Sequence, residues 1–161
     1  MPAPSLTVRR LGPGDLSLLR KLNALFGDAF AEREVYTANP PTDAYLEALL
    51  AKKHIAAIVA LAGEEVAGGL IAYELEKLER ERSEFYIYDL AVSVEHRRKG
   101  VGTFLIQHLR EIAAARGAWV IFVQADYGDD AAIALYESLG AREEVLHFDI
   151  VVQPGSGSGV P

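Results

Sequence analysis

Cysteine is absent from this chain of 161 residues. Without cysteine there can be no disulfide, no thiolate nucleophile and no cysteine-ligated metal. The chain also lacks an apolar run of some 18 residues or more, which excludes a transmembrane helix. Its first residues, Met-Pro-Ala-Pro-Ser, lack the basic and apolar regions of a signal peptide. We therefore expect a cytoplasmic protein.

An excess of basic residues is missing too, because 16 Lys and Arg stand against 23 Asp and Glu, a formal net charge of −7. Nucleic-acid-binding proteins usually carry a basic surface, so this balance argues against such a partner and favours a cationic one. Acidity that serves solubility alone stays open as an alternative. The four histidines fall on unrelated segments, which predicts no metal site.

The length and an apolar content of one half fit one domain, which we place at residues 1–153, with a Gly/Ser-rich tail at 154–161. Hydrophobic periodicity predicts strands at 6–10, 55–62, 66–75, 85–94, 119–124 and 143–152. It predicts helices at about 15–27, 42–51, 102–116 and 129–139, with an irregular segment at 30–41. The apolar run at 119–124 predicts a buried strand. The order indicates an α/β sheet with helices on both faces.

The most informative stretch joins the strand at 85–94 to the following helix through Arg-Arg-Lys-Gly-Val-Gly, residues 97–102. The first N–H groups of a helix have no partner within it, so they point into this loop and form an anion site. The glycines let the backbone approach a bulky anion, and the three cations suit a pyrophosphate. The order of residues fits neither a P-loop nor a dinucleotide fingerprint.

This loop, after a strand that ends in Leu-Ala-Val, resembles the acetyl-CoA loop of the GCN5-related N-acetyltransferases (GNAT), Arg/Gln-x-x-Gly-x-Gly/Ala. The segment Ala-Leu-Tyr-Glu-Ser-Leu-Gly-Ala at 134–141 is similar to a second signature of that family. The resemblance implies the GNAT fold, a mixed and mostly antiparallel sheet whose central strands splay to admit the pantetheine arm. It implies acetyl-CoA as co-substrate, held by Leu90, Ala91, Val92, Arg97, Arg98, Lys99, Gly100, Val101, Gly102, Thr103 and Tyr136.

Three further segments, at 86–92, 124–130 and 142–149, resemble the type I aminoglycoside 3-N-acetyltransferases, which are resistance enzymes of the gentamicin class. This resemblance implies acetyl transfer to the 3-amino group of the 2-deoxystreptamine ring. Because acetyl-CoA is already activated, the amine attacks it directly and no covalent enzyme intermediate is needed. Tyr136 would then give a proton or hydrogen bond to the leaving thiolate.

A polyamine sugar needs carboxylates for its ammonium groups and aromatic faces for its rings. The substrate-binding candidates are Tyr88, Asp89, Asp126, Tyr127, Asp130, Glu144 and Asp149. The general base stays open: Asp126 or Asp149 acts through water, or the site selects the neutral amine. Other readings also stay open, namely an acetyltransferase for a polyamine, another small amine or a protein N-terminus, and a non-catalytic acetyl-CoA-binding module. Neither a membrane partner nor a metal is expected, and monomer and homodimer are both left open.

Overall fold

The computed structural model describes residues 5–153, so the predicted tail lies outside the described residues. The strands are β1 (Leu6–Arg10), β2 (Ile55–Ala62), β3 (Glu65–Glu76), β4 (Ser83–Val92) and β5 (Ala118–Val123). The helices are α1 (Leu16–Ala29), α2 (Arg33–Thr37), α3 (Asp43–Leu50), α4 (Val101–Ala115) and α5 (Asp130–Leu139), with 3-10 turns η1 (Pro13–Asp15) and η2 (Val94–His96). Within residues 5–153 no helix has both the length and the apolar character needed to span a bilayer.

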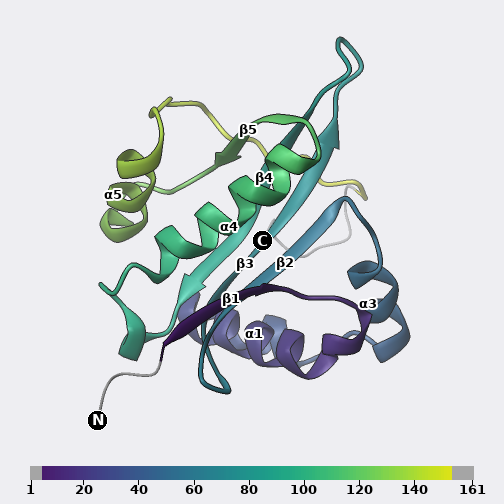
Figure 1. Ribbon diagram of the computed structural model, residues 1–161, viewed down its shortest axis with the longest axis vertical. Helices are drawn as coiled ribbons and strands as arrows, with labels where there is room; N and C mark the ends of the chain where they lie inside the picture. Colours follow the sequence, from purple (N-terminus) through teal and green to yellow (C-terminus); the bar gives the residue numbers. More distant parts are fainter. Residues whose placement is uncertain (1–4, 154–161) are drawn as a thin grey trace.

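The five strands form one sheet in the order β1-β2-β3-β4-β5, antiparallel except for the parallel pair β4–β5. One apolar core, built around Phe85, Leu105 and Leu109, joins the sheet to α4 and α5. The second core, around Leu22 and Phe26, lies on the opposite face beneath α1 and α3. Figure 1 shows α4 and α1 on opposite faces of the sheet. The predicted α/β architecture with helices on both faces is therefore confirmed.

The central strands separate, as the family resemblance implied. β5 pairs with only the first half of β4, from Ser83 opposite Ala118 to Ile87 opposite Val123. β4 then continues to Val92 with no β5 partner. The backbone N–H and C=O groups on that side of β4 are left open for another partner. This open edge of β4 leads directly into the glycine-punctuated loop.

Three local predictions were wrong. Residues 143–152 form no strand, because this segment pairs with no strand within residues 5–153 and a lone strand leaves its backbone groups without hydrogen bonds. β5 is not buried: it lies at the border of the sheet, and Trp119 is 56% exposed. The supposedly irregular segment 30–41 contains the short helix α2.

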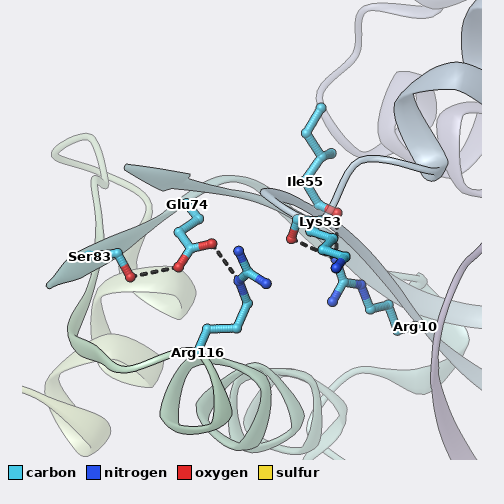
Figure 2. Close-up of polar contacts among 6 residues, drawn as sticks. All are labelled: Arg10, Lys53, Ile55, Glu74, Ser83 and Arg116. Carbon is cyan, nitrogen blue, oxygen red and sulfur yellow. Dashed lines mark hydrogen bonds and ion pairs between the residues drawn. The ribbon is translucent and has the colours of Figure 1, made fainter. Parts of the chain in front are cut away.

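A buried polar group ties β3, β4 and the end of α4 together (Figure 2). The Glu74 carboxylate, with its side chain only 3% exposed, accepts a hydrogen bond from Ser83 Oγ at 2.7 Å and pairs with the guanidinium of Arg116. Nearby, Arg10 donates to the carbonyl oxygens of Lys53 and Ile55 at 3.0 and 2.9 Å. The Glu74 group fixes the start of β4, the strand on which the candidate site is built, whereas the Arg10 bonds hold the end of β1 to the start of β2.

We expect Glu74→Ala to lower the free energy of unfolding by about 3 kcal/mol. The substitution would leave the partly buried guanidinium of Arg116 without its carboxylate partner. Urea denaturation measures this loss. Glu79→Ala is the matched control, since Glu79 lies in the same hairpin and its carboxylate, 53% exposed, pairs with Arg82; its effect should be much smaller. Equal effects of the two substitutions would contradict a structural role for the Glu74 group.

Candidate active site

The loop before α4 has the geometry of an anion site. Gly100 adopts φ 77°, the left-handed conformation that glycine accepts at no steric cost, and α4 begins at the next residue. Phe104 makes the first backbone bond back to Gly100, at 3.0 Å, so the N–H groups of residues 101–103 have no earlier turn to bond. Residues 97–99, all cationic, are exposed beside these N–H groups. Dipole and charge therefore favour an anion at the same place.

Gly102 has a packing role that its sequence context did not indicate. It is buried, and a Cβ at this position would lie 2.7 Å from Leu135 Cδ2 on α5. The missing side chain thus lets α5 pack directly against α4. Its part in cofactor binding stays a prediction, and a substitution there would disturb packing as well as any bound anion.

A cleaner test of the loop is Arg98→Ala combined with Lys99→Ala, two exposed positions. We expect CoA affinity measured by calorimetry to fall roughly tenfold or more, about 1.4 kcal/mol, with a shallower dependence on salt. The double substitution Arg80→Ala and Lys77→Ala, in the β3–β4 hairpin, removes the same charge elsewhere and should leave CoA binding nearly unchanged. An equal loss in both proteins would mean that only net charge matters.

Tyr136 lies on α5, half-buried, with its ring packed against the core beneath α4. Removal from water, followed by the negative charge of Asp129, raises the pKa of Tyr136 to about 12. The phenol therefore stays protonated at neutral pH and can donate a hydrogen bond. Asp129 itself caps α5 by accepting from the N–H of Ala132.

A β-bulge in β4 brings an acid onto the aromatic face of the sheet. Ile71 lies opposite Asp89 while Ala72 lies opposite Ile87, so Tyr88 is the extra residue. Before the bulge the odd-numbered residues of β4, Phe85 and Ile87, face α4. Beyond the bulge the even-numbered residue Leu90 faces α4 instead. Strict alternation would have turned Asp89 towards α4. The bulge instead leaves it on the α1 face, next to Tyr88.

Aromatic rings surround this position. Tyr88 stands edge-on to both Tyr73 and Tyr86, with ring centroids 6.0 and 5.7 Å apart. Tyr86 also stacks on Phe122 of β5, at 4.7 Å, and its hydroxyl donates to Gln124 at 2.8 Å. Tyr88 is 64% exposed. The group therefore presents an accessible aromatic surface, which suits sugar rings and the apolar edges of a cation.

Two carboxylates give this surface a negative potential. Removal from water raises the pKa of Asp89, and the negative charge of Glu32 raises it further. Glu32 follows Ala31, whose left-handed φ of 54° turns the chain between α1 and α2. Burial, and after it the charges of Asp89 and Glu32, raise the pKa of Tyr36 to about 12. A cation entering here would relieve the repulsion between the two carboxylates.

Sequence reasoning named Tyr88 and Asp89 but missed Glu32, Tyr36 and Tyr73 as parts of this site. These three come from an interhelical turn, a short helix and a neighbouring strand, and no motif links them. Tyr36 did carry a weak signal, because an aromatic residue in a loop-like, proline-flanked segment is typical of the wall of a binding site.

The other predicted substrate residues lie on exposed parts of the chain, and the described residues give them different partners. The Tyr127 hydroxyl donates to Glu144, which also pairs with Arg142 at 2.8 Å. Asp149 pairs with His147 at 2.9 Å. Asp130 lies in the first turn of α5, and Asp126 accepts the Asp129 N–H through its backbone oxygen. Within residues 5–153 no hydrogen bond, ion pair or ring contact joins any of them to the tyrosines of β4, so their roles in substrate binding and catalysis remain predictions.

Comparison with known proteins identifies the family and supports the fold. The model of the acetyltransferase (GNAT) family matches residues 20–141. A crystal structure of an aminoglycoside acetyltransferase, HMB0005, from an uncultured soil metagenomic sample is 55% identical, covers 92% of this chain and 99% of that one, and has a TM-score of 0.90. Another, meta-AAC0020, also from soil and in complex with sisomicin, is 33% identical, covers 92% and 97%, and has a TM-score of 0.85.

Among curated proteins, the ribosomal protein bS18-alanine N-acetyltransferase of Escherichia coli strain K12 is 35% identical over 60 residues. That match spans 37% of this chain and only 40% of the curated relative. The family model, by contrast, takes in the cationic loop, both central strands and Tyr136. The chain is a member of the acetyltransferase (GNAT) family.

Proposed function

We propose that this protein transfers the acetyl group of acetyl-CoA to an amino group of an aminoglycoside antibiotic. The observation that supports this proposal most is the pair of carboxylates Asp89 and Glu32, which lie among tyrosines on the aromatic face of β4. This strand also has the open edge that leads to the cationic loop. A polycationic sugar would thus lie beside the place where the acetyl donor is expected.

The proteins most informative about the acceptor support an aminoglycoside. The 55% identical relative is an aminoglycoside acetyltransferase, and a second relative was crystallised with sisomicin. The 3-amino group of 2-deoxystreptamine is the finer proposal, and it rests on the resemblance of segments 86–92, 124–130 and 142–149 to the type I enzymes.

On the acceptor side, Asp89 pairs with the reacting ammonium and takes its proton. Its raised pKa suits this task, since a base works best when its pKa approaches the working pH. Glu32 binds a second ammonium group and fixes the orientation of the sugar. Asp126 or Asp149, acting through water, is the alternative base that the sequence suggested.

On the donor side, acetyl-CoA supplies an activated thioester. Backbone N–H groups on the open edge at 90–92 polarise its carbonyl, and the loop at 97–103 holds the pyrophosphate. The amine nitrogen forms a bond to the carbonyl carbon while the bond from carbon to sulfur breaks. Tyr136 gives its proton to the thiolate. The nitrogen loses two protons in all: Asp89 takes the first before the attack and releases it to water, and the second passes from the acetylated nitrogen through water to the tyrosinate, which restores Tyr136.

The test is a panel of amines offered with acetyl-CoA while release of free thiol is followed. Gentamicin, sisomicin, spermidine and a peptide with an N-terminal alanine cover the rival acceptors, the last because of the partial match to the bS18 enzyme. We expect turnover with the two antibiotics, and NMR of the product should place one acetyl group on the 3-amino group. Acetylation elsewhere on the sugar would refute only the finer proposal. Turnover of the peptide alone would refute the aminoglycoside reading.

A further inference from the structure

Phe104, in the first turn of α4, is a large apolar side chain that contributes little to packing. It is 55% exposed and belongs to neither of the two cores. Within residues 5–153 its ring contacts no other aromatic ring. With about 3.6 residues per helical turn, Phe104 lies on the side of α4 opposite the buried residues Val101, Leu105, Ile106 and Leu109. A single exposed apolar residue is common, so the position of this one decides its meaning.

The ring of Phe104 lies beside the anion site. The Phe104 N–H donates to the carbonyl oxygen of Gly100 at 3.0 Å, so the two residues are one helical turn apart. A Cβ on Gly100 would lie 3.9 Å from Cε2 of Phe104, which shows that the ring leans back towards the loop. Helical side chains lean towards the N-terminus in this way. Because Gly100 has no side chain, nothing at that position covers the ring, and the cations of residues 97–99 are exposed next to it.

The acetyl donor of this family has an aromatic group close to its phosphates. In acetyl-CoA the pyrophosphate joins the pantetheine arm on one side to adenosine 3′-phosphate on the other. With the pyrophosphate at the loop and pantetheine along the open edge of β4, the adenosine leaves the loop on the side away from that edge. Phe104 is the only Phe, Tyr or Trp between Asp89 and Trp119. It is therefore the aromatic side chain that the chain places next to the phosphate site.

We propose that Phe104 binds the adenine ring of acetyl-CoA by stacking, and that this contact lets the enzyme distinguish CoA from donors that carry pantetheine alone. The inference rests on the acetyl-CoA part of the proposed function and is independent of the acceptor. An aromatic side chain stacks on a base through the π faces of both rings and needs no hydrogen bond to do so. The cations at 97–99 hold the phosphates while Phe104 holds the base, so one turn of α4 and its loop recognise the whole nucleotide end.

The first experiment is calorimetry with CoA and with 4′-phosphopantetheine, which lacks the adenine ring. Phe104→Ala should weaken CoA binding roughly fivefold to 150-fold, the range for losing one base stack, and should leave 4′-phosphopantetheine binding unchanged. Leu78→Ala is the matched control, because Leu78 is a fully exposed apolar residue in the β3–β4 hairpin. That protein should bind both ligands like the wild type.

The two ligands separate the ways in which the inference fails. Unchanged CoA binding by Phe104→Ala would overturn the stacking contact alone. An equal loss for both ligands would also overturn it, since Phe104 would then shape the loop and not hold the base. If the wild type bound neither ligand, the acetyl-CoA part of the proposed function would be refuted, and this inference with it.

The second experiment asks whether the contact is a stack of two rings. Phe104→Tyr keeps the aromatic face and should retain wild-type affinity for CoA. Phe104→Leu keeps an apolar side chain without the ring, so it should bind CoA more weakly than the wild type. In the wild type saturated with CoA, NMR should show cross-relaxation between the adenine protons and the ring protons of Phe104. Absence of that signal, or wild-type affinity in Phe104→Leu, would overturn the proposal.

Discussion

Asp89→Asn should lower kcat/KM for gentamicin by roughly 10²- to 10⁴-fold, the range for losing a general base, while acetyl-CoA affinity stays nearly unchanged. The substitution keeps the shape of the side chain but removes the charge that would attract the amine and accept its proton. Steady-state kinetics with calorimetry of CoA binding measures both effects. A loss confined to KM would mean that Asp89 binds the sugar without acting as the base.

The pH dependence of kcat/KM is an independent test of Asp89 as the general base. Its pKa is raised above the ordinary 3.8 by removal from water and by Glu32, so kcat/KM should rise with pH through that raised pKa. A bound ammonium favours the ionised form, and the rise in kcat should therefore occur at lower pH than the rise in kcat/KM. Asp89→Asn should abolish the rise. Glu32→Gln should shift it to lower pH, since it removes the second cause of the raised pKa.

The stability of the Asp89→Asn protein shows whether its loss of activity comes from misfolding. A carboxylate whose pKa is raised by folding opposes the folded state once the pH exceeds that pKa. Asp89→Asn should therefore leave the protein at least as stable at neutral pH. Matched substitutions Asp126→Asn and Asp149→Asn test the alternative base, and a larger loss in either protein than in Asp89→Asn would move the role to that residue.

The sequence predicted the architecture because the deciding signals are local. The strand-loop-helix around Gly100, the periodicity of α1 and α4 and the short turn at Gly63 each depend on neighbours in the chain. Gly69 is similar, because it lies where α1 packs closely on β3: a Cβ there would lie 2.4 Å from Leu22 Cδ1 on α1. At such positions the local structure requires a particular residue type, so the sequence alone indicates them.

The missed features depend on contacts between distant segments. The bulge at Tyr88, which brings Asp89 onto the aromatic face, is a property of the pairing between β3 and β4 and changes no residue pattern. Glu32 reaches this face only because α1 and α2 meet in a tight turn. Residues 143–152 do alternate like a strand, and the prediction was wrong because no edge in the described chain pairs with them. The periodicity of a segment shows whether it is suited to form a strand, and the presence of a pairing partner decides whether the strand forms.

The hydroxyl of Tyr136 is the remaining group on which the proposed chemistry depends. Tyr136→Phe should reduce the rate of acetyl transfer by roughly 10²- to 10⁴-fold, because the thiolate would leave without a proton donor. The ring packs against the core, and within residues 5–153 its hydroxyl makes no hydrogen bond, so the substitution should change stability by less than about 1 kcal/mol.

Single-turnover measurements are needed for this test, because slow product release would hide a change in the chemical step. Since burial and Asp129 raise the pKa of Tyr136 to about 12, its ionisation should cause no loss of wild-type activity until the pH approaches that value. Tyr45→Phe is the control, as Tyr45 is exposed on α3 and should leave the rate unchanged. A single-turnover rate for Tyr136→Phe equal to that of the wild type would make Tyr136 a packing residue and leave protonation of the thiolate to water.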